Sequence, residues 1–190
     1  YAESFNPQSG TGYGGSVFKP TEGKQYEVGI KYQPPGSNSF ITAAIFDLRQ
    51  TNVLTTDPDP THLCGTGRCQ SQDGEVQSRG FELEGKASLN DNLDITAAYA
   101  YLDNRISKSN NTVRYAPISD IGVGPAIAAE GTTTYGVPRH TASAWADYTF
   151  HDGNLKGFGA GAGARYVGSS WGDTANTLKV PGYTLFDAAV

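Results

Sequence analysis

The chain has 190 residues, a net charge of −5 and only 37% hydrophobic residues. No run of about 18 apolar residues occurs, which excludes an ordinary transmembrane helix but not a membrane β-barrel, where only every second residue faces lipid. The acidic balance argues against nucleic-acid binding.

The N-terminal residues have neither the basic start nor the apolar core of a signal peptide. We therefore expect a segment of a longer, mature protein.

Apolar residues recur at every second position in several segments, which predicts β-strands with two unlike faces. In the first of them, Tyr26, Val28 and Ile30 alternate with polar residues and a glycine. The expected strands are 25–32, 40–53, 81–89, 93–103, 141–150, 158–168 and 183–190. Together with an opening fragment at 1–5, they predict an all-β, antiparallel fold of about eight strands.

The predicted connections alternate between short and long. Turn residues mark short connections at 34–38, 90–92 and 151–154. Longer polar links occupy 6–23, 55–74, 107–138 and 168–181. This rhythm is typical of outer-membrane barrels, whose turns face the periplasm and whose loops face outward. The competing interpretation is a soluble β-sandwich, in which the apolar faces would pack into a dry core.

Alternation also predicts which side chains face lipid and which face the lumen. Charges at alternate positions, Glu82, Glu84 and Lys86 on one strand and Asp47 and Arg49 on another, are expected to face the lumen, since charges facing lipid are costly. Aromatic residues near strand ends are expected to form the interfacial girdles. They are Tyr26, Tyr32, Phe40, Tyr99, Tyr101, Tyr148, Phe150 and Tyr166.

The two cysteines, Cys64 and Cys69, lie in one polar stretch. A short disulfide in an oxidising compartment is one interpretation. A pair of metal-binding or redox-active thiols is the other, although the spacing is not C-x-x-C and no histidine cluster accompanies it.

No enzyme signature is present. The three histidines are scattered, and no zinc-protease, hydrolase or phosphate-loop motif occurs. Gly157, Gly159, Gly161 and Gly163 superficially suggest nucleotide binding, but no helix follows them. Their strict alternation instead fits the inner face of a strand that lies close to another group.

Several segments carry a family resemblance in their order and spacing: 23–32, 51–58, 77–87, 98–103, 137–148 and 165–173. They resemble the second half of the barrel in TonB-dependent outer-membrane receptors for ferric siderophores, and most of all the ferrichrome (hydroxamate) type. The resemblance implies a barrel of about 22 strands. Residues 1–190 would be part of that barrel domain, and the plug domain would lie outside this chain.

The resemblance further implies TonB-coupled uptake of a ferric siderophore across the bacterial outer membrane, without enzymatic activity. Iron would enter only as the chelated substrate, and no cofactor is expected. The implied partners are the ferric siderophore, the TonB complex through the missing N-terminal region, and outer-membrane lipid and lipopolysaccharide. Phages or bacteriocins are further implied partners. The alternative function is a passive, porin-like barrel without a plug.

A ferric chelate needs a concave site lined by aromatic groups and a few donors. Among the loop aromatics, which also include Tyr13 and Phe18, we expect Tyr115, Tyr135 and Trp171 to contact the ligand. Packing within the loops is the alternative for each. Arg114 and Arg139 would suit an anionic ligand or, alternatively, salt bridges within the loops.

Overall fold

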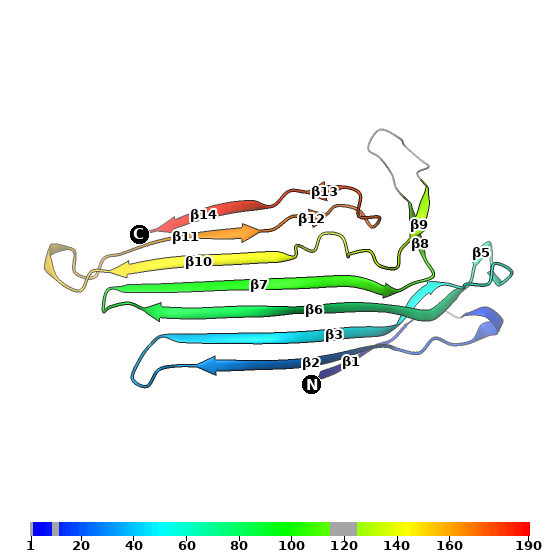
Figure 1. Ribbon diagram of the computed structural model, residues 1–190, viewed down its shortest axis with the longest axis horizontal. Helices are drawn as coiled ribbons and strands as arrows, with labels where there is room; N and C mark the ends of the chain where they lie inside the picture. The colour runs from blue at the N-terminus through cyan, green and yellow to red at the C-terminus, as the bar shows by residue number, and fades with distance from the viewer. Residues whose placement is uncertain (1, 9–11, 115–124) are drawn as a thin grey trace.

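A computed structural model describes residues 2–8, 12–114 and 125–190 of the chain. Eight strands form one antiparallel sheet, and each pairs with the next of these strands along the chain (Figure 1). Their order is β1 (Ala2–Asn6), β2 (Thr21–Tyr32), β3 (Phe40–Thr56), β6 (Gln70–Ser88), β7 (Leu93–Lys108), β10 (His140–Thr149), β11 (Gly159–Val167) and β14 (Tyr183–Ala189). The predicted antiparallel all-β fold is confirmed.

The predicted alternation of connections is also confirmed. Short connections join the strands at one end of the sheet, and one of them contains the 3₁₀ turn η2 (Gly153–Leu155). The long connections emerge at the other end (right in Figure 1), which we call the loop end. They contain the 3₁₀ turn η1 (Tyr13–Gly15) and three small hairpins. These hairpins are β4 (Leu63–Cys64) with β5 (Gly67–Arg68), β8 (Thr112–Arg114) with β9 (Ala126–Ala128), and β12 (Ser170–Trp171) with β13 (Lys179–Val180).

Three central strands run further toward the loop end than predicted. β3, β6 and β7 contain 17, 19 and 16 residues. β6 begins at Gln70, whereas the sequence predicted a strand only from Phe81. The added length is mostly polar, and its few apolar residues, such as the cross-strand pair Val76 and Ile106, do not alternate regularly. It therefore lacks the pattern from which strands were predicted, while its backbone hydrogen bonds continue the ladder.

The strand register divides the sheet into two chemically distinct faces. Val28 lies opposite Ile45, Ile45 opposite Phe81, and Phe81 opposite Tyr101. We call this side, which continues through Leu83 and Tyr99, the apolar face. The other side carries Glu82, Glu84 and Lys86, as predicted, and we call it the polar face.

Three predicted facings are wrong. Asp47 and Arg49, predicted to face the lumen, are opposite Arg79 and Gln77 on the apolar side, beyond the last apolar residues. At this height on the sheet the apolar band has already ended, so charged side chains can lie on the apolar side. Phe40, predicted among the lipid-facing aromatics, pairs with Lys86 on the polar face, where the Lys31 ammonium lies 5.3 Å from the centre of its ring.

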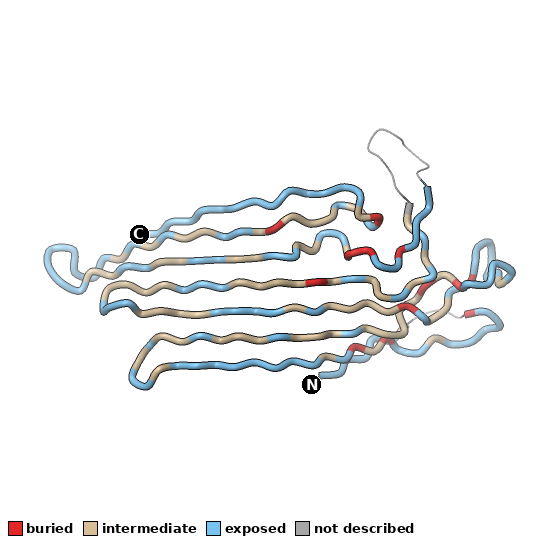
Figure 2. Tube along the Cα trace, viewed as in Figure 1, coloured by how far each residue is buried: buried red, intermediate tan, exposed pale blue. Residues whose placement is uncertain are grey.

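The sheet is a single layer without a hydrophobic core. Among the described residues, Cys69, Ala129 and Ala175 are the only buried hydrophobic ones. Val28 and Ile30 are 68% and 69% exposed, and Leu83 is 42% exposed. Buried positions gather toward the loop end instead (Figure 2). A soluble sandwich would bury these side chains. The interpretation of the chain as a soluble β-sandwich is therefore wrong.

The alternating glycines of β11 accommodate an indole on the polar face. A Cβ atom on Gly161 would lie 2.5 Å from Trp145 Cζ2, and one on Gly163 would lie 2.6 Å from Trp145 Cε3. The register pairs Trp145 with Gly163. The alternating glycines predicted that another group lies close to this strand. That group is the ring of Trp145, which covers the two glycines.

In the described part of the chain, no helix has the length and hydropathy needed to cross a membrane.

Candidate functional site

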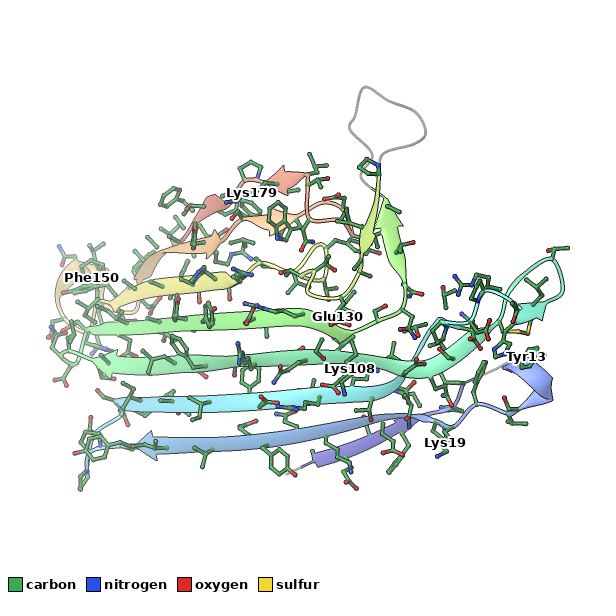
Figure 3. The ribbon with its side chains drawn as sticks, turned by 45° about the vertical axis from the view of Figure 1, so that its right-hand side comes forward. Tyr13, Lys19, Lys108, Glu130, Phe150 and Lys179 are labelled. Atoms are coloured by element: carbon green, nitrogen blue, oxygen red, sulfur yellow. A yellow bond between two sulfur atoms is a disulfide. The ribbon has the colours of Figure 1, made fainter. Side chains whose placement is uncertain are left out.

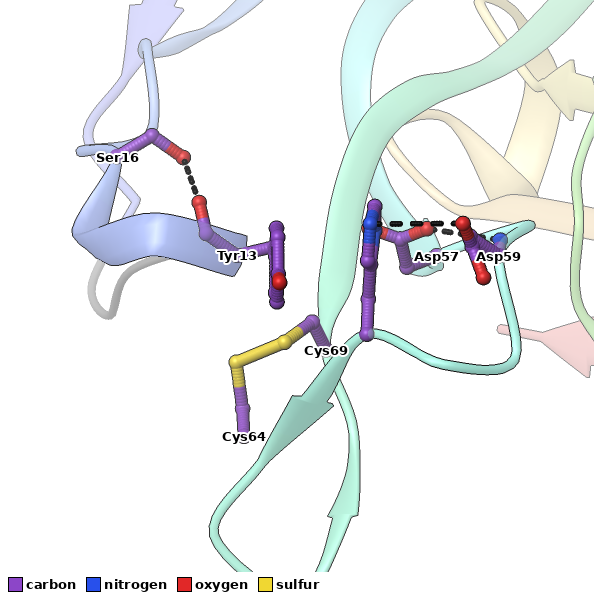
Figure 4. Close-up of a disulfide and its surroundings, with 7 residues drawn as sticks. Tyr13, Ser16, Asp57, Asp59, Cys64 and Cys69 are labelled. Carbon is purple, nitrogen blue, oxygen red and sulfur yellow. Dashed lines mark hydrogen bonds and ion pairs between the residues drawn. A yellow bond between two sulfur atoms is a disulfide. The ribbon is translucent and has the colours of Figure 1, made fainter.

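The buried side chains of the described structure gather toward the loop end, where several loops pack against one another. Its first component joins the segment before β2 to the segment between β3 and β6 (Figure 4). The ring of Tyr13 stacks on His62 with the centroids 3.7 Å apart and the planes 9° apart. His62 Nδ1 lies 3.0 Å from Asp57 Oδ2, and its Nε2 lies 3.5 Å from Asp59 Oδ2. We call Tyr13, Asp57, Asp59 and His62 the histidine clamp.

Hydrogen bonds keep both clamp carboxylates ionised. The backbone N–H of Asp59, with the imidazole of His62, holds the pKa of Asp57 below its ordinary value. The hydroxyl and backbone N–H of Thr61 lower the pKa of Asp59 in the same way. Arg68, on β5, donates a hydrogen bond to the backbone carbonyl of Asp57. This contact connects β5 to the histidine clamp.

Cys64 and Cys69 form a disulfide beside the clamp, with their Cα atoms 4.9 Å apart. The structure therefore favours the disulfide interpretation over free thiols. Within the described ranges, no group of three or more His, Cys, Asp or Glu residues is arranged to hold a metal ion.

Asparagine side chains connect the third long loop to β3 and β6. Asn111 Oδ1 accepts hydrogen bonds from the backbone N–H and the hydroxyl of Thr56 at 2.7 and 2.9 Å. Asn110 Nδ2 donates to Asp73 Oδ2 at 2.5 Å. These contacts fix the base of the β8–β9 hairpin, which projects from the loop end (Figure 1).

The segment that leads into β10 packs against the β12–β13 hairpin. The backbone N–H of Thr133 donates to Asn176 Oδ1, and Asn176 Nδ2 donates back to the Thr133 carbonyl at 2.8 Å. The N–H of Gly136 donates to the carbonyl of Trp171 at 2.7 Å. Two loops that are distant in sequence thus form one surface.

The tip of that hairpin is built around Asp173. Burial raises the pKa of this carboxyl, but hydrogen bonds from the Thr177 hydroxyl and from the backbone N–H groups of Leu178 and Thr177 outweigh it and hold the pKa below its ordinary value. The carboxylate therefore has a structural role in the turn.

One buried carboxylate on β7 is shared by three guanidinium groups. The side chain of Asp103 is 5% exposed, and it lies 2.8 Å from Arg105, 3.4 Å from Arg79 and 3.8 Å from Arg139. Arg139 also donates to Thr133 Oγ1 at 3.4 Å. Three positive charges around one negative charge leave an electropositive surface here.

A cavity of about 90 Å³ lies between the segment that precedes β10 and the β12–β13 hairpin. Besides Val137, two cations, three hydroxyl groups and one indole line it. They belong to Arg139, Lys179, Thr133, Ser169, Ser170 and Trp171. We call this the cationic pocket.

The predicted ligand-contacting aromatics have different surroundings. Trp171 is half-buried and lines the cationic pocket. Tyr135 is 57% exposed and immediately precedes Gly136, so its backbone is held near that of Trp171. Tyr115 lies outside the described residues.

The other candidates divide between loop packing and the pocket. Tyr13 stacks within the histidine clamp, and the ring of Phe18 lies close to Gly12. Arg139 reaches both Asp103 and the pocket, while Arg114 lies on β8. Sequence reasoning did not identify Lys179, Thr133 or the two serines, because they meet Arg139 only through the packing of two distant loops.

The whole chain matches a known family. Residues 1–190 match the family described as TonB dependent receptor-like, beta-barrel. The chain is 40% identical over 190 residues to the ferrichrome outer membrane transporter/phage receptor of Escherichia coli K12, covering all of this chain and 22% of that protein. It is 36% identical over 190 residues to the ferrioxamine B receptor of Salmonella typhimurium, again covering all of this chain and 24% of the relative.

The fold matches solved structures as well. The siderophore receptor PiuA from Acinetobacter baumannii superimposes with a TM-score of 0.73 at 26% identity, over 98% of this chain and 26% of that chain. This chain thus spans about a quarter of the length of the relatives it matches.

Proposed function

Because the chain belongs to the TonB-dependent receptor β-barrel family, we propose that residues 1–190 are part of the barrel domain of an outer-membrane receptor that imports ferric hydroxamate siderophores. The observation that carries this proposal is the match over the whole chain to a ferrichrome transporter and to ferrioxamine receptors. These relatives are receptors or transporters, so the proposed protein moves its ligand without chemical conversion.

The two faces of the sheet support a position in the membrane. The apolar face has the exposed Val28, Ile30 and Leu83, which water would solvate poorly. The polar face has Glu82 and Glu84, which hydrocarbon would disfavour. A wall with lipid on one side and an aqueous or protein-filled lumen on the other satisfies both faces, as in large outer-membrane barrels.

We propose that the loop end recognises the siderophore. Trp171 and Tyr135 supply aromatic surface there, and the pairing of Gly136 with Trp171 holds their segments together. Tyr115 stays a candidate on sequence grounds. The TonB complex would act on the part of the receptor outside this chain.

Lipopolysaccharide is a proposed partner on the apolar side of the wall. Arg49 and Arg79 lie beyond the apolar band on this side, and their side chains are 57% and 58% exposed. Guanidinium groups at that height suit the phosphates of an outer-leaflet lipid. One relative is also a phage receptor, so phage or bacteriocin docking on the projecting loops is part of the proposal.

The test uses the complete receptor expressed in a bacterial strain that lacks its own hydroxamate receptors. We expect uptake of radiolabelled ferric hydroxamates that disappears when TonB is deleted or the proton gradient is collapsed. A passive porin would instead admit small solutes at the same rate without TonB. TonB-independent permeation without saturable ferric-chelate binding would contradict the proposed function.

A further inference from the structure

We propose that the cationic pocket is a binding subsite for an anionic oxygen group, such as a carboxylate, carried on the periphery of the ferric chelate. The inference rests on the proposed function and extends it to ligand selectivity. It concerns Arg139 and Lys179 as charge-bearing contacts, with Thr133, Ser169 and Ser170 as hydroxyl donors.

The first argument is the charge balance. Asp103 is the carboxylate within ion-pair distance of Arg139, but Arg105 and Arg79 lie closer to it. Arg139 therefore has the weakest hold on the shared carboxylate, at 3.8 Å, and its side chain is 44% exposed. Arg139 is therefore the guanidinium of the three that is least engaged by Asp103, which allows it to contact another anion.

Lys179 adds a second available cation. In the described part of the chain, no carboxylate lies within ion-pair distance of its ammonium group. Lys179 is exposed on β13 (labelled in Figure 3) and pairs through its backbone with Trp171. The carboxylate of the same hairpin, Asp173, is already bound by Thr177 and Leu178.

The second argument is size and chemistry. The pocket volume of about 90 Å³ is enough for several water molecules. That volume accepts a carboxylate but not a whole ferric chelate, so the pocket would bind a substituent while the chelate stays outside. A guanidinium, an ammonium and neighbouring hydroxyls are the donors that an anionic oxygen group requires.

The third argument is position. The pocket joins two loops that the structure fastens to each other through Thr133 and Asn176. The donors are therefore held in place before a ligand arrives, which lowers the entropic cost of binding. Trp171 on the pocket wall offers an adjacent flat surface for the body of the chelate.

The experiment compares two linear ferric trihydroxamates of equal length, one ending in a carboxylate and the other in an amine, on the complete receptor in detergent. We expect Lys179→Gln to weaken binding of the carboxylate-ended chelate about tenfold, equivalent to about 1.4 kcal/mol, and to change binding of the amine-ended chelate less than twofold. Arg139→Gln should act in the same direction. Because Arg139 also contacts Asp103, its replacement could act through that carboxylate. The Lys179 variant is therefore the one that tests the subsite.

Charge-preserving variants and a distant charge removal complete the design. Lys179→Arg and Arg139→Lys should retain most of the preference for the carboxylate. Lys156→Gln, in the short connection at the opposite end of the sheet, should leave binding of both chelates unchanged. Equal weakening of both chelates by Lys179→Gln, or no weakening of either, would overturn the subsite.

The outcomes separate this inference from the proposed function. If the unaltered receptor binds both chelates and Lys179→Gln shows no selectivity, only the subsite is wrong. If the unaltered receptor binds neither, both proposals fall. If Lys179→Gln lowers only the amount of lipopolysaccharide phosphate that co-purifies with the receptor, the pocket is a lipid contact, and its assignment to the chelate is wrong.

Discussion

Leu83 and Glu84 are neighbours in the sequence, but their side chains lie on opposite faces of β6. Leu83 is opposite Ala43 and Tyr99, within the apolar band. Glu84 is opposite Thr42 and Ala98 on the polar face. One step along the chain therefore changes the surroundings of a side chain from hydrocarbon to a polar interior, in the proposed membrane position.

We expect Leu83→Arg to impair membrane assembly, because an arginine near the middle of the apolar band costs about 2–4 kcal/mol. Glu84→Arg, the matched control, should assemble almost normally. The measurement is the heat-modifiable fraction of folded receptor after refolding into lipid vesicles. Equal losses for the two variants would contradict the assigned faces.

The contact between Trp145 and the β11 glycines gives a second prediction. Gly161→Ala should destabilise the folded receptor by about 1–3 kcal/mol, because the added methyl group has no space beside the indole. In Gly159→Ala, on the same face, the added methyl group would lie at ordinary contact distance, 3.6 Å from Tyr148 O and 3.8 Å from Thr149 Oγ1, so this variant should be nearly neutral. Urea unfolding in vesicles measures the difference.

A double variant checks the cause of that effect. If the indole is what Gly161 accommodates, Trp145→Ala combined with Gly161→Ala should cost less than the sum of the two single changes. Strict additivity would mean that the alanine acts on something other than the ring.

At the level of elements, the loops are held by a few polar contacts and one disulfide. The histidine clamp joins η1 to the loop between β3 and β6, and Asn111 joins the β8–β9 hairpin to Thr56. Such contacts depend on ionisation and on covalent closure, whereas the sheet depends on its backbone ladder.

The two carboxylates of the clamp should lose their hydrogen bonds in acid. The pKa values of Asp57 and Asp59 are lower in the folded chain than the ordinary value of about 3.9. Their contribution is therefore complete above about pH 4 and is lost as pH falls through the folded values. Hydrogen exchange of the Asp59 amide, which donates to Asp57, should accelerate relative to its intrinsic rate below about pH 4.

Two controls make this pH test specific. The Ala129 amide donates to the carbonyl of Asn111 and has no titrating partner, so its protection should stay constant over the same range. Asp57→Asn should remove the pH dependence at Asp59. Acceleration that persists in Asp57→Asn would show that another group controls the loop.

Removing the disulfide should act on one loop only. Closing a ring of about six residues constrains the unfolded chain by roughly 2 kcal/mol. We expect the double variant Cys64→Ser, Cys69→Ser to be cleaved faster by protease within residues 57–69, with no change in the thermal unfolding of the barrel. Titratable thiols in the unreduced receptor would contradict the pairing in the first place.

The sequence was sufficient to predict the elements that cross the apolar band. Within this band the two faces of the sheet have different surroundings, so apolar and polar residues must alternate along each strand. The face on which Val28, Leu83 and Tyr99 lie could therefore be read from the sequence. Beyond the band both faces are mostly polar, and the regular alternation is lost. For that reason the extension of β6 to Gln70 and the apolar-side position of Asp47 were not predicted.

The candidate site was predicted only in part. Trp171 could be singled out as a loop aromatic, but its neighbours could not be identified. Lys179 and Arg139 are 40 residues apart, and their convergence depends on the contact of Asn176 with Thr133. No local pattern encodes such a contact between loops.

The whole sheet is a strip with two open sides. In the described structure, β1 pairs only with β2, and β14 pairs only with β11. Inside a bilayer, an unpaired backbone group costs several kcal/mol. On the β1 side of the sheet, the unpaired backbone within the apolar band belongs to residues 26–32 of β2, because β1 pairs only with residues 21–25. We infer that this stretch of β2 and β14 pair with further barrel strands in the complete receptor.

This inference predicts that residues 1–190 do not form a heat-modifiable, protease-resistant species when expressed alone and refolded into vesicles, whereas the complete receptor does. Co-refolding with the remaining barrel strands should restore resistance. A stable, monodisperse product from the isolated segment would contradict the need for neighbouring strands.

In the proposed membrane position, the length of β6 sets the distance between the loop end and the bilayer. From Gln70 to Arg79 the strand continues for ten residues past the apolar band, about 30 Å of chain at roughly 3.3 Å per residue. With a tilt of about 40° this becomes a rise of some 25 Å. In the proposed receptor, this part of the sheet is a wall that stands above the membrane around the pore mouth. A small chelate would pass inside this wall, whereas a bulky phage fibre would contact its outer edge without entering.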